Sequence, residues 1–290
     1  MHPDPQLQLK RYFFSYKMIN MKSEFKEGEP TKVEKVLIDH GDKFAIIAST
    51  HGDFIAYREA IDKFVELGAE YFFHSGDITG EFIQPAECIE YAFTRPNSYG
   101  VLGNHDLLVL GYDYIYTYND TIKKTAEETA KLLDSTKLQM LNSAPIKIET
   151  PFFNVVHESV SPPYYAQRSK KRRKSRDWSI GSCADENTTS VCYGRIDKVH
   201  FIGSDHAAYV LHAQPRLKVI KPRPGDELIA PSRSVVSAPS ITFSRDSDYD
   251  CGGILGEILE DGSVKLKFIS FKPLSHSELF SFCFKHSEED

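Results

Sequence analysis

The sequence predicts an α/β fold, and three observations lead to this prediction. Short apolar runs of strand length alternate with segments whose apolar residues recur at helical spacing. Polar turns that contain histidine, aspartate or asparagine directly follow several of these runs. The composition is that of an ordinary globular protein, with 41% hydrophobic and 26% charged residues in a chain of 290. Because the carboxyl ends of parallel strands lie along one edge of a sheet, we expect the polar turns to lie close together.

The first half of the chain reads as repeated strand–turn–helix units. Residues 44–48 form a continuous apolar run, which is typical of a buried strand. Residues 54–67 then carry apolar side chains at helical spacing, and Gly68 supplies a stop. The elements expected after these are strand 71–73, helix 85–93, strand 99–102 and helix 121–133.

The second half is richer in strands. Asp261 and Gly262 lie between two apolar segments and form a strong hairpin signal. We expect one domain at 41–275, an N-terminal extension at 1–40, an insert or cap at 158–198 and a C-terminal tail at 276–290. The expected strands are 152–156, 198–203, 209–212, 235–236, 254–259 and 264–271.

Cysteine usage and hydropathy indicate a cytoplasmic protein. The five cysteines are scattered and form no CxxC pair, so we expect reduced thiols. No apolar run approaches the ~18 residues that span a bilayer. The N-terminal segment also lacks the pattern of a secretory signal. We therefore expect no membrane partner.

One strongly basic run lies in the predicted insert. Residues 168–176 carry seven positive charges and no negative one, whereas the whole chain has a net charge of −6. Nucleic acid is a candidate partner for this run, but the acidic remainder of the chain does not favour it. Arg172 and Arg173 are instead predicted to bind substrate phosphate, with a solvated loop as the simpler alternative. Arg245 is a further cation that could reach the same edge, or could form a surface ion pair.

Five strand ends carry side chains that ligate metals or transfer protons. A lone histidine at a strand end is usually an ordinary hydrogen-bonded residue. The ordered set is more informative, because each member directly follows an apolar strand. The set comprises His51, Asp77, Asn104 with His105, His157, and His206 with Asp205.

These motifs resemble those of the calcineurin-like metallophosphoesterases over about residues 44–271. The family reads Asp-x-His, Gly-Asp, Gly-Asn-His-(Asp/Glu), His and Gly-His-x-His at successive strand ends. Residues 235–240 also resemble the family's Asn-Pro-Gly-Ser segment in degraded form. The resemblance implies a two-sheet core flanked by helices in four α/β/β/α layers. The matching segments here are Ser49-Thr50-His51, Gly76-Asp77, Gly103-Asn104-His105-Asp106, His157 and Gly203-Ser204-Asp205-His206.

The resemblance also implies roles for these residues in a metal-dependent phosphoesterase. His51 and His206 would bind one divalent metal, and Asn104 and His157 a second. Asp77 would bridge the two ions. His105 would act as general acid with Asp106 as its orienting partner, while metal-activated water attacks a phosphomonoester or phosphodiester. Nitrogen and oxygen ligands suit manganese, iron or zinc.

Two positions depart from the family pattern. Ser49 replaces an aspartate and Ser204 replaces a histidine, so each predicted metal loses one ligand. Asp53 and Asp205 are the candidate compensating ligands. Retention of His105 and Asp106 favours an enzyme that holds one or two ions, because these residues have no evident structural duty without catalysis. The two serines favour the alternative, a catalytically impaired or inactive protein that serves as a binding or scaffold module.

Overall fold

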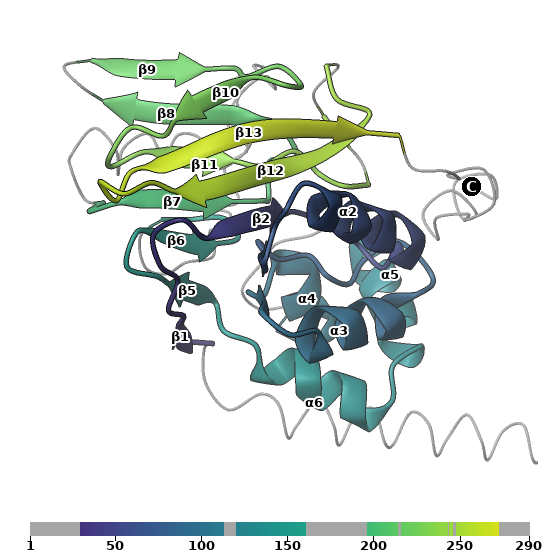
Figure 1. Ribbon diagram of the computed structural model, residues 1–290. Helices are drawn as coiled ribbons and strands as arrows, with labels where there is room; N and C mark the ends of the chain where they lie inside the picture. Colours follow the sequence, from purple (N-terminus) through teal and green to yellow (C-terminus); the bar gives the residue numbers. More distant parts are fainter. Residues whose placement is uncertain are drawn as a thin grey trace, which may run out of the picture.

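Two β-sheets packed face to face form the body of the protein, and a group of helices covers one of them (Figure 1). In the part of the chain that the structure describes, no helix has both the length and the apolar character needed to cross a membrane. The computed structural model describes residues 30–112, 120–160, 196–213, 216–242, 244–245 and 248–272.

The six-stranded sheet is mixed. Its parallel half, β2, β3 and β4, comes from the predicted strand–turn–helix units. Its antiparallel half contains the hairpin predicted at Asp261-Gly262. The strand order is β10 (Glu227–Ile229), β13 (Val264–Phe271), β12 (Cys251–Ile258), β2 (Lys43–Ile47), β3 (Tyr71–His74) and β4 (Ser98–Gly100).

The seven-stranded sheet is also mixed, and β6, β7 and β11 run parallel within it. Its first strand, β1, lies inside the predicted N-terminal extension. Because β1 pairs with β5 and Ile38 just after it is buried, these residues belong to the fold. The strand order is β1 (Val33–Lys35), β5 (Lys147–Glu149), β6 (Phe153–Val156), β7 (Val199–Ile202), β11 (Val235–Ser237), β8 (Tyr209–Ala213) and β9 (Leu217–Ile220).

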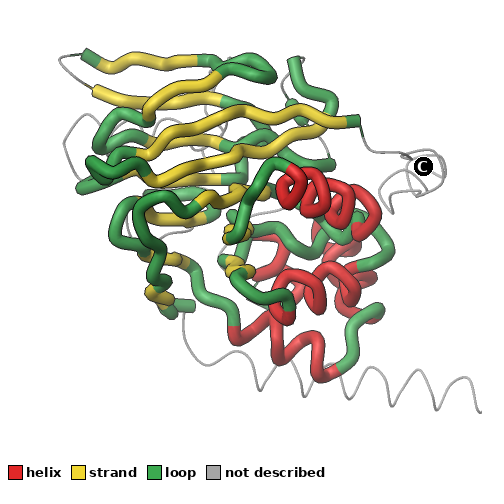
Figure 2. Tube along the Cα trace, in the orientation of Figure 1, coloured by secondary structure: helices red, strands yellow, loops and turns green. Residues whose placement is uncertain are grey.

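The described helices gather on one face of the six-stranded sheet (Figures 1 and 2). The side chain of Asp53 caps the first of them by accepting a hydrogen bond from the backbone N–H of Ala56. Pro85 begins the next, a position where proline loses no helical hydrogen bond. The helices are α2 (Phe54–Glu66), α3 (Pro85–Thr94), α4 (Asn104–Val109), α5 (Asp120–Lys131) and α6 (Ser135–Ser143).

Aromatic side chains fill the space between the sheets. Phe44 stacks on Phe153 with ring centroids 4.5 Å apart, and Phe73 and Phe201 contact the same pair edge to face. Full burial of each such side chain contributes roughly 1.5–3 kcal/mol. Since alternate residues of a strand face opposite sides, Ala45 packs against the helices instead. This shared core fixes the edge of one sheet relative to the other.

The predicted two-sheet α/β fold with flanking helices is confirmed, with differences in detail. The sequence reading missed β1, β5, β9 and β10, which are three or four residues long. It also missed α4 and α6. In the residues that the structure describes, helices flank only the six-stranded sheet, and most of the predicted insert, residues 161–195, lies outside them.

Candidate functional site

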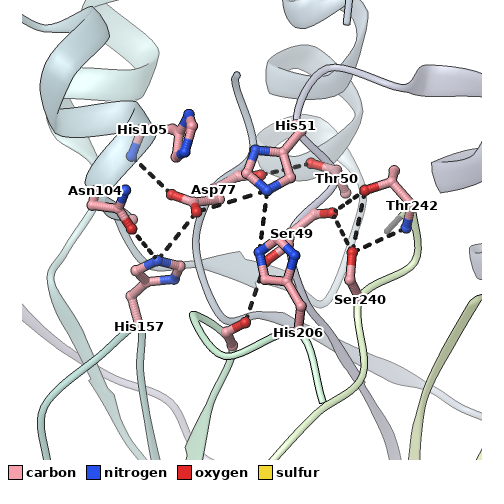
Figure 3. A network of polar contacts seen from close by, with 12 residues as sticks. Ser49, Thr50, His51, Asp77, Asn104, His105, His157, His206, Ser240 and Thr242 are labelled. Carbon is pink, nitrogen blue, oxygen red and sulfur yellow. Dashed lines mark hydrogen bonds and ion pairs between the residues drawn. The ribbon is translucent and has the colours of Figure 1, made fainter. Parts of the chain in front are cut away.

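Five predicted metal ligands lie together at the carboxyl ends of strands from both sheets (Figure 3). Strands β2, β3 and β4 of one sheet and β6 and β7 of the other lead into the turns that carry them. Because these strands run parallel within each sheet, their polar ends meet at one edge of the sandwich. The residues are all buried, and they are His51, Asp77, Asn104, His157 and His206.

One side of the site is a compact set of three possible ligands. His51, Asp77 and His206 each offer one ligand atom, and these atoms lie within 4.8 Å of one another. The Nε2 atoms of the two imidazoles are 3.3 Å apart, and His51 Nε2 is 3.9 Å from Asp77 Oδ2. Two facing ring nitrogens at this distance share at most one proton. His51 Nδ1 is buried and has no hydrogen-bond partner among the residues that the structure describes.

The other side is already hydrogen-bonded within the protein. His157 Nδ1 donates to the Ser75 carbonyl at 2.6 Å, and His157 Nε2 lies 2.9 Å from Asn104 Oδ1 and 3.3 Å from Asp77 Oδ2. All three partner atoms are oxygens that only accept. Both nitrogens of His157 therefore carry protons in this arrangement, so the ring is an imidazolium paired with Asp77.

The pKa values of the histidines agree with these two hydrogen-bonding patterns. Burial, followed by repulsion from His105, holds the pKa of His51 well below its usual value. Burial and the nearby Arg245 charge lower the pKa of His206 to about 3. Burial also disfavours a charged His157, but the Asp77 carboxylate outweighs it and raises the pKa of His157 to about 9. The first pair is thus neutral, which is the protonation state that ligates metals.

The backbone of the site is strained. Ser49, His51, Asp77 and His206 have φ values of 55°, 50°, 54° and 56°, in the left-handed region that non-glycine residues seldom occupy. Each such residue costs on the order of 1–3 kcal/mol, and persists only where its surroundings impose it. Three of the four carry the compact set of ligands, so the fold imposes strain where it aims these side chains.

Two glycines allow the ligands to lie against backbone. A Cβ atom at Gly103 would come within 2.2 Å of both the backbone nitrogen and Oδ1 of Asp77. A Cβ at Gly76, whose φ is +90°, would lie 2.5 Å from His157 Nδ1. Close approach of this kind needs a residue without a side chain. The Gly-Asp and Gly-Asn-His motifs therefore have a packing reason for their glycines.

His105 lies beside the ligands and is more exposed than they are. It begins α4 together with Asn104, and its backbone N–H donates to Asp77 Oδ1 at 2.9 Å. Its ring meets that of His51 edge to face, with centroids 4.7 Å apart. Figure 3 draws no hydrogen bond to the His105 ring. This placement leaves the imidazole able to meet a bound molecule.

The prediction that Asp106 orients His105 is wrong. The fully buried Asp106 carboxylate accepts four hydrogen bonds, from the backbone N–H of Gly103, Ile78 and Thr79 and from the Thr79 hydroxyl. Adjacent residues of a helix do not face each other, which explains why it turns away from His105. Asp106 instead ties the start of α4 to the loop that carries Asp77.

The two predicted compensating carboxylates serve other partners. Asp53 Oδ1 caps α2, and Asp205 Oδ2 accepts a hydrogen bond from the Tyr209 hydroxyl. In the described part of the chain, neither belongs to a group of side chains spaced to hold a metal. Asp205 lies in the turn between β7 and His206. Neither carboxylate therefore replaces the missing ligands in this arrangement.

Ser49, which stands at one of the two positions that depart from the family pattern, forms hydrogen bonds through both its hydroxyl and its carbonyl. Its hydroxyl donates to the Gly203 carbonyl at 3.3 Å. Its own carbonyl accepts from the Ser240 and Thr242 hydroxyls at 3.1 and 2.9 Å. The sequence motifs alone did not identify Thr242 or Thr79 as part of the site. The degraded segment at 235–240 was the signal nearest to Thr242.

The predicted substrate cations Arg172 and Arg173 lie outside the described residues. Among the residues described, Arg245 is the cation that acts on the site. Its backbone N–H donates to the His206 carbonyl at 2.9 Å, and its side chain is exposed. Glu81, half-buried on the loop after Asp77, is a second charged residue near this edge that the sequence motifs missed. No local pattern marks Glu81, because its loop position arises only in the folded chain.

The fold and the site together define a class of protein. The sequence model of the calcineurin-like phosphoesterases matches residues 42–193, which is more than half of the chain. The chain therefore belongs to the calcineurin-like phosphoesterase family, and the predicted family membership is confirmed. Members of this family act on phosphate esters and generally bind divalent metals.

Particular relatives give the same picture at the level of the fold. A metallophosphoesterase from Sphaerobacter thermophilus has a TM-score of 0.59 and 21% identity, covering 80% of this chain and 90% of its own. A hypothetical protein from Pyrococcus horikoshii OT3 has a TM-score of 0.52 and 19% identity, covering 82% and 89%. These likenesses show the shared fold alone.

A curated relative is similar over a shorter stretch. An uncharacterized protein from Methanocaldococcus jannaschii is 30% identical over 105 residues. This stretch is 36% of the present chain and 43% of the relative, so less than half of that protein is matched.

The donor set fits a divalent transition metal. The compact side offers two neutral imidazole nitrogens and one carboxylate, whose pKa the nearby His157 and His105 hold well below its usual value despite burial. Such mixed nitrogen and oxygen ligands are typical of manganese, iron and zinc sites. A cation between His51 and His206 would be bound by both Nε2 lone pairs, in place of the proton that the two rings can share. The residues present are therefore suited to at least one ion.

Proposed function

We propose that this protein is a metal-dependent phosphoesterase that hydrolyses a phosphomonoester or phosphodiester. The observation that carries the proposal is the buried group of His51, Asp77 and His206, within 4.8 Å of one another and beside the more exposed His105. A structural cluster of histidines would not need strained backbone at each member.

In this proposal the metal ligands and the acid are different residues. His51, Asp77 and His206 would hold one ion, and Asn104 and His157 would flank a second beside the shared Asp77 carboxylate. When bound, a divalent cation supplies Lewis acidity toward the phosphoryl group and lowers the pKa of water.

His105 would have a role separate from ligation. Its ring would face the leaving-group oxygen and donate a proton to it, because it lies next to the ligands while its imidazole is free of hydrogen bonds in the described structure. Its backbone hydrogen bond to Asp77 holds the helix start in place. The shared carboxylate thus positions the acid as well as the ion.

A test is hydrolysis of bis(p-nitrophenyl) phosphate and p-nitrophenyl phosphate by metal-free protein with added Mn²⁺, Fe²⁺ or Zn²⁺. We expect metal-dependent turnover that His105→Ala reduces by at least about 100-fold, the scale of one acid–base group. Asp77→Asn should also abolish most of the turnover, because it removes the negative charge of the shared ligand. His40→Ala is the matched control, because that exposed histidine contacts Phe152 and the Leu259 carbonyl away from the site.

The substitutions at Ser49 and Ser204 favour a second candidate function, that of a binding or scaffold module. The two proposals differ in one outcome. Folded protein that shows no turnover with any of these ions on either ester would contradict the enzyme and support the scaffold.

A further inference from the structure

The carbonyl of Ser49 is held by two buried hydroxyls from a distant segment. Ser240 Oγ donates to it at 3.1 Å and Thr242 Oγ1 at 2.9 Å (Figure 3). A carbonyl oxygen has two lone pairs, so these two donors use both. Ser49 stands where the family has a metal-binding aspartate, and in this chain the position serves as a junction between segments.

The proton positions of the junction follow from its partners. Each hydroxyl has one proton, and each donates it to Ser49. Ser240 Oγ in turn accepts the backbone N–H of Thr242 at 3.1 Å. The 3.2 Å contact between the two hydroxyl oxygens then needs no proton of its own. Every group in the junction therefore has a consistent hydrogen-bonding role.

The hydroxyls are attached to a rigid part of the sheet. Ser240 pairs with Ala48 beside the end of β2, and the backbone N–H of Ile241 donates to the Ala48 carbonyl at 3.1 Å. The Ser240 carbonyl accepts from the backbone N–H of Gly252 at the start of β12, at 2.9 Å. Ser240 is 0% exposed, so this anchor is inside the core.

The junction lies two residues before His51, in the same strained turn. Ser49 has a φ of 55° and His51, two residues later, a φ of 50°. Left-handed residues persist only when their surroundings over-determine them, and the two hydroxyl bonds are among the contacts that hold Ser49. The Ser49 hydroxyl also bonds to the Gly203 carbonyl on the loop that leads to His206. The same residue thus links the loops of both histidines.

We propose that Ser240 and Thr242 are positioning residues that, through the Ser49 carbonyl, set the relative placement of His51 and His206 for metal binding. This inference rests on the proposed metal site. Loss of a group that orients a ligand typically weakens metal binding by about 10–100-fold. The chain would then compensate for a lost ligand by tighter orientation of those that it keeps.

The test compares Mn²⁺ affinity by calorimetry in metal-free wild type, Thr242→Val, Thr242→Ser and Ser240→Ala. We expect Kd to rise about 10-fold in Thr242→Val and in Ser240→Ala, and to stay near the wild-type value in Thr242→Ser, which keeps the hydroxyl. Ser270→Ala is the matched control, since its hydroxyl makes the same kind of bond, to the Cys251 carbonyl, outside the site.

Histidine-ring ¹⁵N NMR of the metal-free proteins is the second readout. We expect the signals of His51 and His206 to shift in Thr242→Val and not in Ser270→Ala. Unchanged Kd and unchanged ring signals in both hydroxyl-deletion variants would overturn the positioning role alone. Wild-type protein that binds no Mn²⁺, Fe²⁺ or Zn²⁺ would overturn the proposed metal function, and would overturn this inference with it.

Discussion

The two sides of the site use the same residue types in opposite ways. His157 places both ring nitrogens on oxygen acceptors and is held as an imidazolium by Asp77. His51 and His206 instead place nitrogen against nitrogen, 3.3 Å apart, and are kept neutral by burial. A cation bound by His157 must displace a proton from an imidazolium, whereas a cation bound by His51 and His206 meets neutral rings. The same residue type is thus charged on one side of the site and neutral on the other, according to its hydrogen-bond partners and burial.

The largest effects are expected when one histidine is removed from each side of the site and metal binding is measured. His206→Gln should weaken binding of the tighter Mn²⁺ ion by at least about 100-fold, more than loss of an orienting group would. His157→Gln should leave that ion bound, because it takes no ligand from the compact side. Calorimetric stoichiometry and elemental analysis measure both effects. A larger loss from His157→Gln would reverse the assignment of the two sides.

Asp106 holds the loop that carries Asp77, the carboxylate that both sides of the site share. Asp106→Asn should lower the free energy of unfolding by about 2–3 kcal/mol, because an amide puts a donor against backbone N–H groups that need an acceptor. Urea unfolding of metal-free protein measures it. Asp134→Asn is the control, since that exposed residue also caps a helix. Equal losses in the two variants would contradict the scaffolding role.

His200 in β7, a buried histidine outside the site, is a reference for the effect of burial on the pKa of a histidine. His200 accepts from the Asn154 amide at 3.0 Å, and burial lowers its pKa to about 4 from a usual 6.5. Below pH 6.5 the unfolded chain therefore binds a proton that the folded chain does not. Stability should fall as pH drops from 6.5 to 4, by up to ~3 kcal/mol from this residue.

The check is urea unfolding of the metal-free protein across that pH range. His200→Gln should flatten the profile relative to wild type, and the part that persists should come from other buried histidines. A profile of unchanged slope would show that His200 does not contribute.

The smallest expected effect is that of Arg245, the exposed residue next to His206 on the side of the site with neutral histidines. Arg245→Ala should raise KM about 10-fold, equivalent to ~1.4 kcal/mol, with little change in kcat or Mn²⁺ affinity, because a surface guanidinium contacts phosphate and not metal. Arg245→Lys should recover part of the loss. Steady-state kinetics on both nitrophenyl esters would reveal it. A fall in kcat at constant KM would assign Arg245 to the chemical step instead.

Local sequence determined much of the fold and the membership of the site. The alternation of apolar runs and helical periods predicted the long central elements, because their burial depends on pattern. The short strands β1, β5, β9 and β10 were missed. In β9, all four residues are exposed, so no apolar alternation marks the strand. The five ligand candidates follow strands whose carboxyl ends lie together, and the resemblance to the family's motifs gave them their predicted role as ligands.

What only the tertiary structure decided is how each side chain is used. Asp106 follows His105 directly, yet helix geometry turns it toward Thr79 and Gly103. Ser49 reads as a lost ligand, yet packing against Ser240 and Thr242 makes it a junction. Hydrogen-bond partners distant in the chain are not encoded in local spacing. They follow from the way the two sheets pack, which sets the distances between segments that no single motif contains.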